Sequence, residues 1–304
     1  MDGLSAAGSA YLVDASLYVF RSWHALPAES FRDAEGHPAN ATHGFTRFLL
    51  ELLERERPQY VLLAFDIALG SSFRNLLYPP YKANREPAPP ELLRQFDACR
   101  ALGTLLGISS VAHASYEADD LIGSGAAVAH AQGLDCVIVS ADKYFGQLLG
   151  ARDQQWDWAR QTRWGPRGVH ARFGVWPEQI ADFLGLCGDA ADNFPGVPGI
   201  GARGAARLLA RHGDLETLLT HTDAVAADRS LRGAALLAAR LQQHADTARL
   251  CKRLATIACD APLPADCLRR RDGDAQALDV WLQANRIGPH TCERAHAVLA
   301  QAVA

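Results

Sequence analysis

Three short apolar runs, each ending in an aspartate, constrain the fold of this chain most. The runs are Tyr11-Leu-Val-Asp14, Val61-Leu-Leu-Ala-Phe-Asp66 and Val137-Ile-Val-Ser-Ala-Asp142. Their length and their β-branched or aromatic residues predict buried parallel strands, with crossover helices expected at residues 45–55 and 118–132. Because ligands of open α/β sheets lie at the carboxyl ends of the strands, the three aspartates are expected to meet in one crevice.

The composition limits the class of protein. The chain has 304 residues and is 49% hydrophobic, enough for one large domain or two small ones. It has no run of about 20 apolar residues, and no basic region precedes an apolar run at its start, so neither a membrane span nor a secretory signal is expected. Seven cysteines without a CxxC pair favour reduced thiols in the cytoplasm over a zinc site. No obligate protein partner is evident.

Two regions are expected along the chain. Residues 1–175 carry the strand pattern, and residues 176–304 open with a helix expected at 177–186. A glycine-rich loop and a second helix at 202–212 follow, and the remaining Ala- and Leu-rich sequence carries no readable motif.

A segment at residues 70–95 interrupts the first region. It is rich in proline, tyrosine and basic residues, and its prolines between Pro79 and Pro90 argue against one continuous helix. We interpret it as a flexible insertion over the active face.

Eight carboxylates are expected to gather at the crevice. They are Asp14, Asp66, Glu117, Asp119, Asp120, Asp142, Asp189 and Asp192. Taken singly, an aspartate after a strand is often a helix N-cap, and acidic residues in a first turn favour the helix dipole. Together, like charges so close must protonate or bind cations. Oxygen ligands without a His or Cys cluster suit Mg²⁺ or Mn²⁺, and two such ions would activate a water and stabilise the leaving oxygen of a phosphodiester.

The net charge at first argues against a nucleic-acid partner. It is −4, but setting aside the eight carboxylates of a metal site leaves +4 for the rest of the chain. A mildly basic surface around an acidic, metal-filled centre is compatible with a phosphate polymer as substrate.

The run Gly196-Val-Pro-Gly-Ile-Gly201, followed by a helix, is a helix–hairpin–helix signature. Glycines at 196, 199 and 201 let backbone N–H groups approach phosphates, and the helix N-terminus attracts the anion. Arg203 and Arg207 would add positive charge without reading sequence. The plainer alternative is a tight turn between two helices.

Basic and aromatic residues in the insertion suggest contacts with a nucleic acid. Lys82 and Arg85, with Arg74 earlier, are expected to clamp the scissile phosphate and offset its transition-state charge. Tyr78 and Tyr81 are expected to stack on an unpaired base. The alternative is a solvated charged loop.

Nearly the whole chain from about Ala10 to about Leu219 resembles the 5′-nuclease domain of bacterial DNA polymerase I and its flap-endonuclease relatives. The stretches that carry the resemblance, in matching order and spacing, include YLVDASLYVFRSWHALP, YEADDLIGSGAAVA, VSADKYFGQLL and FPGVPGIGARGAARLL. The resemblance implies a PIN-like (Rossmann-like) α/β core with a parallel sheet, a helical arch and an α-helical helix–two-turn–helix (helix-hairpin-helix) module. It also implies DNA cleavage to a 5′-phosphate and a 3′-hydroxyl with two Mg²⁺ ions.

The resemblance also assigns roles to residues by position. Two groups of carboxylates match two metal sites: Asp14, Asp66, Glu117, Asp119 and Asp120 the tighter one, and Asp142, Asp189 and Asp192 the second. Arg21, Lys82 and Arg85 match the basic residues of the family that handle phosphate. In some relatives the hairpin backbone holds a K⁺ ion, which here would involve residues 197–201.

One departure from the family pattern concerns the second metal site. The family usually reads Asp-Lys-Asp after the third strand, whereas this chain reads Asp142-Lys143-Tyr144. A phenol, neutral at pH 7, replaces an anionic ligand. We therefore expect activity that needs more Mg²⁺ or Mn²⁺ than in a member with the full set.

The sequence favours a structure-selective 5′→3′ exonuclease and flap endonuclease acting on DNA with 5′ ends or flaps. The chain ends near residue 304 without a polymerase portion, so a stand-alone nuclease is expected. Two alternatives stay open. One is a non-catalytic protein that binds DNA structures, supported by Tyr144. The other is a PIN-type ribonuclease, which would share the acidic core but not the hairpin.

Overall fold

The computed structural model describes residues 8–67 and 70–301, which form two compact units. Of these residues, 8–67, 87–140 and 258–301 form the first unit, and 70–86 and 141–257 form the second. The first unit therefore includes the carboxyl-terminal segment.

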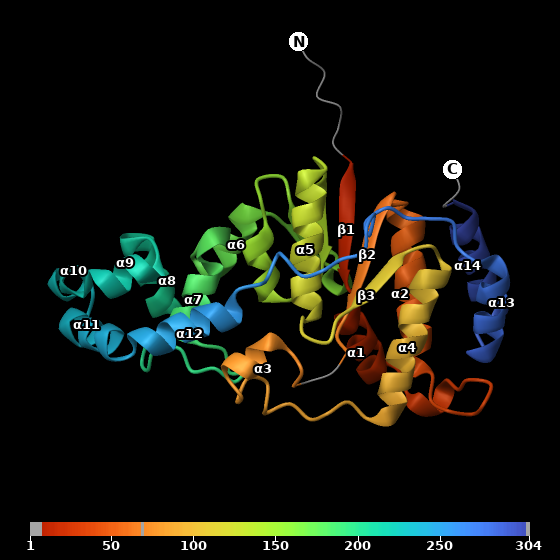
Figure 1. Ribbon diagram of the computed structural model, residues 1–304, viewed down its shortest axis with the longest axis horizontal. Coiled ribbons are helices and arrows are strands. Elements are labelled where there is room, and N and C mark those ends of the chain that lie inside the picture. Colours follow the sequence, from red (N-terminus) through yellow and green to blue (C-terminus); the bar gives the residue numbers. More distant parts are fainter. Residues whose placement is uncertain (1–7, 68–69, 302–304) are drawn as a thin grey trace, which may run out of the picture. The chain divides into compact units, whose positions relative to one another are not determined.

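The first unit is built on four parallel strands in the order β3-β2-β1-β4 (Figure 1). They are β1 (Ser9–Asp14), β2 (Tyr60–Phe65), β3 (Ser109–Ala112) and β4 (Asp135–Val139). In the register of the sheet, Asp14 lies opposite Ala64, and Val13 lies opposite Val139. Because β1, β2 and β4 are buried on both faces, they read as nearly continuous apolar runs, and the three predicted strands are confirmed.

Helices cover both faces of this sheet. The helices of the first unit are α1 (Ala15–Ala25), η1 (Ala28–Ser30), α2 (Asn40–Glu56), α4 (Pro90–Leu105), α5 (Ala118–Ala131), α13 (Ala275–Ala284) and α14 (Pro289–Gln301). Helix α5 packs on one face, and α1, α2 and α4 lie on the other (Figure 1). A Cβ at Gly125 of α5 would lie 2.8 Å from Leu62 Cδ2, so this glycine lets the helix approach the sheet closely.

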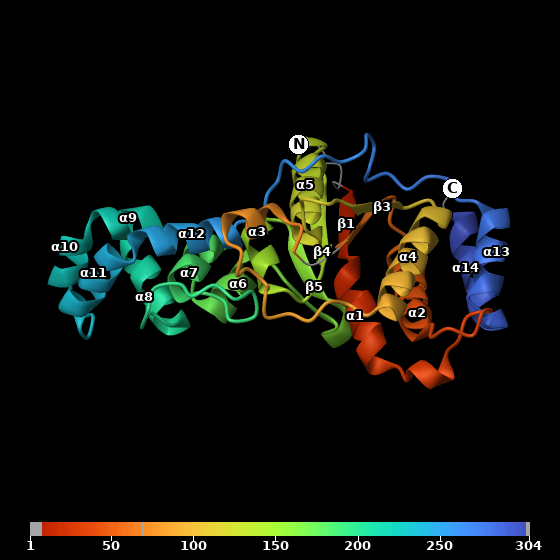
Figure 2. The ribbon, with the colours of Figure 1, turned by 60° about the horizontal axis from the view of Figure 1, so that its bottom comes forward.

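The carboxyl-terminal helices α13 and α14 complete the first unit. They pack against α4 and α2, on the side of these helices away from the sheet (Figure 2). Trp281 of α13 donates its Nε1–H to the carbonyl of Ala98 on α4 at 3.1 Å. These helices bury part of the apolar surface of the first unit, and no sequence pattern predicted this role.

The second unit is mostly helical, with one antiparallel strand pair (Figure 2). Its elements are α3 (Phe73–Leu77), η2 (Lys143–Leu148), β5 (Gln154–Asp157), η3 (Trp158–Arg160), β6 (Thr162–Trp164), α6 (Pro166–Phe173), η4 (Pro177–Gln179), α7 (Ile180–Cys187), α8 (Ala202–His212), α9 (Leu215–Thr220), α10 (Thr222–Ala227), α11 (Ala234–Gln243) and α12 (Ala245–Ala255). The helices predicted at 177–186 and 202–212 are confirmed, the first beginning as the 3₁₀ turn η4.

No continuous helix spans residues 70–95, as the prolines predicted. The segment contains the five-residue helix α3, then turns, and Pro90 opens α4 at its first position, where a missing N–H is tolerated. Across the part of the chain that the structure describes, no helix is long and apolar enough to cross a bilayer.

Candidate functional site

The first cluster of carboxylates lies at the carboxyl edge of the parallel sheet. We use this name for Asp14, Asp66, Glu117, Asp119 and Asp120. Asp14 is the last residue of β1, and Asp66 follows the last residue of β2. The Oδ1 atom of Asp66 accepts a hydrogen bond from the backbone N–H of Ala118 at 2.9 Å. Since Ala118 begins α5, this bond places the exposed Asp66 side chain at the start of the helix that carries Asp119 and Asp120.

Asp14 is held by partners on two elements. It is 7% exposed and caps α1, because its Oδ1 accepts from Leu17 N–H at 3.1 Å. Its Oδ2 accepts from the Ser140 hydroxyl at 2.8 Å. Ser140 stands just after β4, so it positions Asp14 from the neighbouring strand. The sequence analysis missed Ser140, although its place at the end of the third apolar run was a usable signal.

Asp120 has a structural role in addition to its predicted role as a ligand. The residue is fully buried, and its Oδ2 accepts from Glu117 N–H at 3.0 Å, closing a capping box at the start of α5. Its Oδ1 accepts from Ala258 N–H at 2.9 Å. Removing this side chain would therefore leave two N–H groups without their acceptor, whatever its part in metal binding.

The second cluster of carboxylates lies in the second unit and consists of Asp142, Asp189 and Asp192. Asp142 does not end a strand: β4 stops at Val139, and Asp142 caps the 3₁₀ helix η2 by accepting from Tyr144 N–H at 2.9 Å. Asp189 precedes a tight turn at residues 190–193 and forms an isolated bridge with Phe194, and Asp192 lies within this turn.

The second cluster already has cationic and phenolic partners. The Oδ2 atom of Asp189 accepts from the Tyr144 hydroxyl at 2.9 Å and lies 2.8 Å from Lys143 Nζ. The Oδ1 atom of Asp192 lies 2.5 Å from Arg85 Nη2. Tyr144, which stands where the family resemblance predicts an aspartate, thus donates a hydrogen bond to Asp189.

Burial, together with neighbouring charges and hydrogen bonds, shifts the pKa values of the groups at this cluster. Burial raises the pKa of Asp142, with Asp192 adding to the shift and Lys143 opposing it. Burial alone would also raise the pKa of Asp189, but the ion pair with Lys143 and the bond from Tyr144 bring it below its usual value. Burial and the two neighbouring carboxylates raise the pKa of Tyr144, which therefore stays a neutral donor.

The insertion is bound to the turn that carries the second cluster. Lys82 N–H donates to the Asp192 carbonyl at 3.0 Å, Asn84 Nδ2 donates to the Ala190 carbonyl at 3.1 Å, and Asn193 Nδ2 donates to the Pro80 carbonyl at 2.7 Å. Together with the Arg85 ion pair, these bonds bring both predicted phosphate-binding residues, Lys82 and Arg85, to the second cluster. Residues 80–85 of the predicted insertion are thus hydrogen-bonded to the turn at residues 190–193.

Two predicted DNA contacts are wrong because their side chains are buried. Arg74 is 2% exposed, and its guanidinium donates to the carbonyls of Leu254 and Thr256, each at 2.8 Å. Tyr81 is also 2% exposed, and its hydroxyl donates to Asp192 Oδ2 at 3.3 Å. Both side chains therefore anchor the insertion within the second unit and present no surface to a base or a phosphate.

Arg21, the third predicted phosphate-handling residue, lies exposed on α1, the helix that Asp14 caps. It belongs to the first unit, whereas Lys82 and Arg85 belong to the second.

In the predicted hairpin the apolar side chains and Gly196 are buried, whereas the other two glycines are exposed. Val197 is 1% exposed and Ile200 is 3% exposed, whereas Gly199 and Gly201 are exposed. Gly196 and Gly199 have φ values of +64° and +79°, which L side chains rarely adopt. Within the described residues, the backbone N–H groups of Gly199 and Gly201 have no hydrogen-bond acceptor. They are available to an anion at the start of α8.

Basic residues flank the hairpin. Arg203 is exposed in the first turn of α8, and Arg207 follows one turn later, donating to the Ser230 carbonyl. The guanidinium of Arg240 on α11 lies against Gly199, where a Cβ would collide with it. Arg240 was missed because 41 positions separate it from Gly199, and no local pattern marks such a contact.

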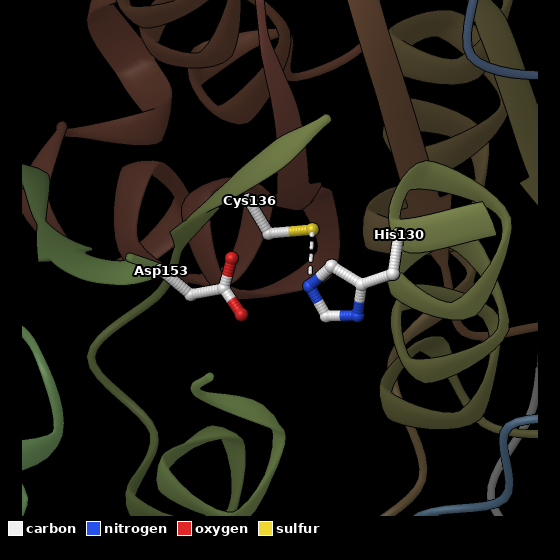
Figure 3. Close-up of side chains that lie close together, drawn as sticks. All are labelled: His130, Cys136 and Asp153. Atoms are coloured by element: carbon white, nitrogen blue, oxygen red, sulfur yellow. Dashed lines mark hydrogen bonds between the residues drawn. The ribbon is translucent and has the colours of Figure 1, made fainter. Parts of the chain in front are cut away.

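A further polar pair lies in the first unit, on α5 and β4. His130 Nε2 lies 3.5 Å from Cys136 Sγ (Figure 3). Asp153, also drawn in Figure 3, belongs to the second unit, where its Oδ2 accepts from Gly150 N–H at 2.7 Å.

These features define a class of protein: a resolvase-like α/β domain with carboxylates at its strand ends, combined with a helical module of the SAM type that carries a glycine hairpin. Two adjoining family models match the chain. The first describes the N-terminal resolvase-like domain of 5′-3′ exonucleases and matches residues 9–174, and the second describes their C-terminal SAM fold and matches residues 175–276. The chain belongs to the 5′-3′ exonuclease family.

Similar curated proteins are bacterial DNA polymerases I. The thermostable enzyme of Thermus filiformis is 37% identical over 281 residues, which is 91% of this chain and 32% of that protein. The enzyme of Bacillus caldotenax is 36% identical over 257 residues, which is 83% of this chain and 28% of that protein. The chain thus spans about a third or less of the length of these relatives.

Solved structures share the fold at low sequence identity. The 5′-exonuclease of T5 with bound zinc has a TM-score of 0.65 and 17% identity, covering 97% of this chain and 99% of its own. The catalytic core of Rad2 in complex with a DNA substrate has a TM-score of 0.62 and 13% identity, covering 99% of this chain and 95% of its own.

Proposed function

We propose that the protein is a structure-selective 5′→3′ exonuclease and flap endonuclease, which hydrolyses DNA phosphodiester bonds near free 5′ ends with the help of divalent ions. The observation that carries this proposal is the first cluster, gathered at the carboxyl edge of the sheet in a member of the 5′-3′ exonuclease family. DNA as the substrate is supported by the Rad2 and T5 structures, which are described as complexes with DNA.

The first cluster fits a divalent ion. Within the described residues, Asp66 Oδ2 has no hydrogen-bond donor, and its side chain is exposed. Oxygen-only ligands suit Mg²⁺ or Mn²⁺, and when bound such ions lower the pKa of a water and stabilise the leaving oxygen. We propose that this cluster holds the tighter of two ions.

The second cluster fits a divalent ion less well. Asp189 is already paired with Lys143, and Asp192 with Arg85. An ion that binds there must compete with Lys143 and Arg85 for these carboxylates. Tyr144 adds no negative charge that would strengthen the binding of the ion. We therefore propose that the second ion binds more weakly than the first.

The basic residues of the insertion are proposed to act on the scissile phosphate. Once released from Asp192, Arg85 would bind phosphate oxygens and offset the charge that grows in the transition state. Lys82, three residues before Arg85, and Arg21 on α1 are proposed to act in the same way.

The hairpin is proposed to grip the duplex by its backbone. The N–H groups of Gly199 and Gly201 would donate to phosphate oxygens, and Gly196 sets the turn that presents them. Arg203 and Arg207 would add charge. Backbone carbonyls of residues 197–201 are the proposed ligands of a K⁺ ion.

A substrate panel tests this function. We expect the full-length chain in Mg²⁺ to cut a 5′-flap DNA faster than the matched 3′-flap and blunt duplexes, whose 5′ ends are substrates for the exonuclease activity alone. Asp66→Asn should lower the rate by at least 100-fold, because the amide keeps the acceptor for Ala118 N–H but loses the negative charge. Glu51→Gln, an exposed acidic position on α2, should cut like the parent. Cleavage of an RNA flap in preference to DNA would instead indicate a PIN-type ribonuclease.

A non-catalytic DNA-structure binder is the second candidate. It is supported by Tyr144 and by the pairing of Asp189 and Asp192 with cations. Tight binding to the 5′ flap with no cutting in either Mg²⁺ or Mn²⁺ would favour it.

We propose that the functional boundary between the nuclease region and the DNA-binding region lies near residues 175 and 176. We also propose that the protein is located in the cytoplasm, on the basis of its free thiols.

A further inference from the structure

A separate cleft of the first unit is lined by arginines. Its volume is about 720 Å³. Four arginines line it, Arg57 at the end of α2 and Arg269, Arg270 and Arg271 in the segment before α13, with Tyr60 at the start of β2. Four positive charges in one cleft repel each other unless something negative lies among them.

Among the residues that the structure describes, the most buried of these arginines has no anionic partner. Arg270 is 9% exposed, and its Nε and Nη2 donate to the carbonyls of Leu106 at 3.2 Å and Val298 at 2.8 Å. Burial lowers the pKa of Arg270, and no carboxylate offsets this effect. A buried guanidinium is costly without a counter-ion, so its position points to an anion in the cleft.

The other arginines are not neutralised either. Throughout the described part of the chain, the side chains of Arg57 and Arg269 have no hydrogen bond or ion pair, and Arg271 donates only to the Ala265 carbonyl at 3.1 Å. Two aspartates, Asp266 and Asp272, also line the cleft, but neither forms an ion pair among the described residues. The walls therefore carry a surplus of about two positive charges.

The backbone that presents the arginines is fixed. Val61 N–H donates to the Leu268 carbonyl at 2.6 Å, and Arg270 N–H donates to the Gln59 carbonyl at 2.9 Å. Arg271 N–H donates to the Gly107 carbonyl at 2.8 Å. The cleft is thus formed before any ligand arrives, which reduces the entropy lost on binding.

A purely structural explanation accounts for part of this arrangement. Arg57 at the carboxyl end of α2 is favoured by the helix dipole, and Arg270 ties α14 to the core through Val298. Neither role explains why Arg269 also faces the cleft or why the surplus charge is left without a partner. We propose that this cleft binds a nucleoside monophosphate, with its phosphate among the arginines and its nucleoside against Tyr60.

The chemistry of the cleft favours this ligand over a smaller anion. A phosphate monoester carries roughly two negative charges at pH 7, which matches the surplus. Pockets of about 300–1,000 Å³ hold small organic ligands, so a phosphate ion alone would leave most of the space empty. The half-buried ring of Tyr60 offers a surface for base stacking, and the Gln59 amide offers a donor and an acceptor.

The cleft is distinct from the proposed nuclease site. Tyr60 begins β2 and Asp66 follows its end, so the two lie roughly 20 Å apart along the strand. The inference therefore does not rest on the proposed function, and substitutions in the cleft are expected to leave flap cleavage unchanged.

Calorimetric titration of the full-length chain with dAMP tests the proposal, with EDTA present so that no divalent ion binds phosphate elsewhere. We expect one saturable site. Arg57→Ala and Arg269→Ala should each weaken dAMP binding about tenfold or more, because each removes a charge-assisted hydrogen bond from an exposed side chain that the fold does not need. Arg253→Ala, an exposed arginine of α12 in the second unit, should bind like the parent.

Two further ligands separate the sources of the phosphate. A 5′-phosphorylated oligonucleotide that binds as tightly as dAMP, with the same loss in Arg269→Ala, would place the end of a nucleic acid in the cleft. Binding of dAMP alone would identify a free nucleotide. No saturable binding of dAMP, unchanged binding by both arginine variants, or equal affinity for dAMP and inorganic phosphate would overturn the proposal.

Discussion

At the scale of single residues, Tyr144 occupies the position at which the family resemblance predicts a further carboxylate. Its hydroxyl donates to Asp189, and its ring is 6% exposed, so the side chain fills the place where a further carboxylate is expected. A neutral donor stabilises the negative charge of Asp189, but it cannot ligate a divalent ion as a carboxylate does.

Replacing Tyr144 tests this effect on metal use. Tyr144→Asp should lower the Mg²⁺ concentration that gives half-maximal flap cleavage, because it restores an anionic ligand beside Asp142 and Asp189. Tyr144→Phe serves as the matched control, since it keeps the ring, removes the bond to Asp189 and should not lower the Mg²⁺ requirement. A Tyr144→Asp variant that binds metal and cuts no better than the parent would show that the substitution is irrelevant to the second ion.

Residue types and spacing predicted the members of the first cluster but not their partners. Asp14 and Asp66 stand at strand ends, which the sequence marks clearly, and both lie at the same edge of the sheet. Arg74 and Tyr81 were read as surface residues because they lie among prolines and charges. Their burial depends on contacts with residues 254, 256 and 192, far along the chain, which no local pattern encodes.

At the scale of elements, the insertion is fixed by a small number of hydrogen bonds that can be removed one by one. Asn193→Ala deletes the bond to the Pro80 carbonyl. The amide of Lys82, which donates to the Asp192 carbonyl, should then exchange with deuterium roughly fivefold faster, as expected for a loss of about 1 kcal/mol.

Hydrogen exchange measured by mass spectrometry on peptides that cover residues 78–86 provides the readout. Gln243→Ala, which alters an exposed side chain of α11, should leave this exchange as in the parent. If the Lys82 amide exchanges at the rate of an unstructured peptide already in the parent, the described docking of the insertion does not hold in solution.

Helix α9 carries a cap with a clear dependence on pH. Asp214 accepts from Thr217 N–H at 2.8 Å and from the Thr217 hydroxyl at 3.0 Å, and these bonds lower its pKa. Because the folded pKa is depressed, the contribution of this cap is complete above the unfolded pKa of about 3.9. It is lost as the pH falls through the folded pKa.

Asp214→Ala should therefore lower the free energy of unfolding by about 0.5–1 kcal/mol at pH 7, the lower part of the usual range because the side chain is exposed. The difference from the parent should shrink at pH 3. Asp214→Asn should retain most of the cap at both values. Urea denaturation at the two pH values measures these differences, and an equal loss at pH 3 and pH 7 would rule out the charged cap.

At the scale of the whole molecule, the carboxyl-terminal helices α13 and α14 belong to the first unit, although residues 141–257 of the second unit separate them in sequence from the rest of it. Trp281, 9% exposed, packs α13 against α4. Trp281→Ala should destabilise the first unit by about 3–5 kcal/mol, because it leaves a large cavity and the Ala98 carbonyl without its donor. Val280→Ala, next to it but 65% exposed, should change stability by less than about 0.5 kcal/mol.

Thermal and chemical unfolding of the two variants compares a buried with an exposed position on one helix. Equal stability of Trp281→Ala and Val280→Ala would mean that α13 does not pack against α4 in solution. The sequence alone did not predict this packing, because the Ala- and Leu-rich tail matches many helical contacts equally well and carries no motif that selects one.

The proposed nuclease activity requires that the carboxylates at the carboxyl edge of the sheet bind divalent ions. Calorimetric titration of Mn²⁺ into the full-length chain tests it most directly, with Asp66→Asn as the variant and Glu51→Gln as the control. We predict a tight site in the parent and in Glu51→Gln that is lost or at least tenfold weaker in Asp66→Asn. Absence of saturable Mn²⁺ binding in the parent, or unchanged tight binding in Asp66→Asn, would contradict the account.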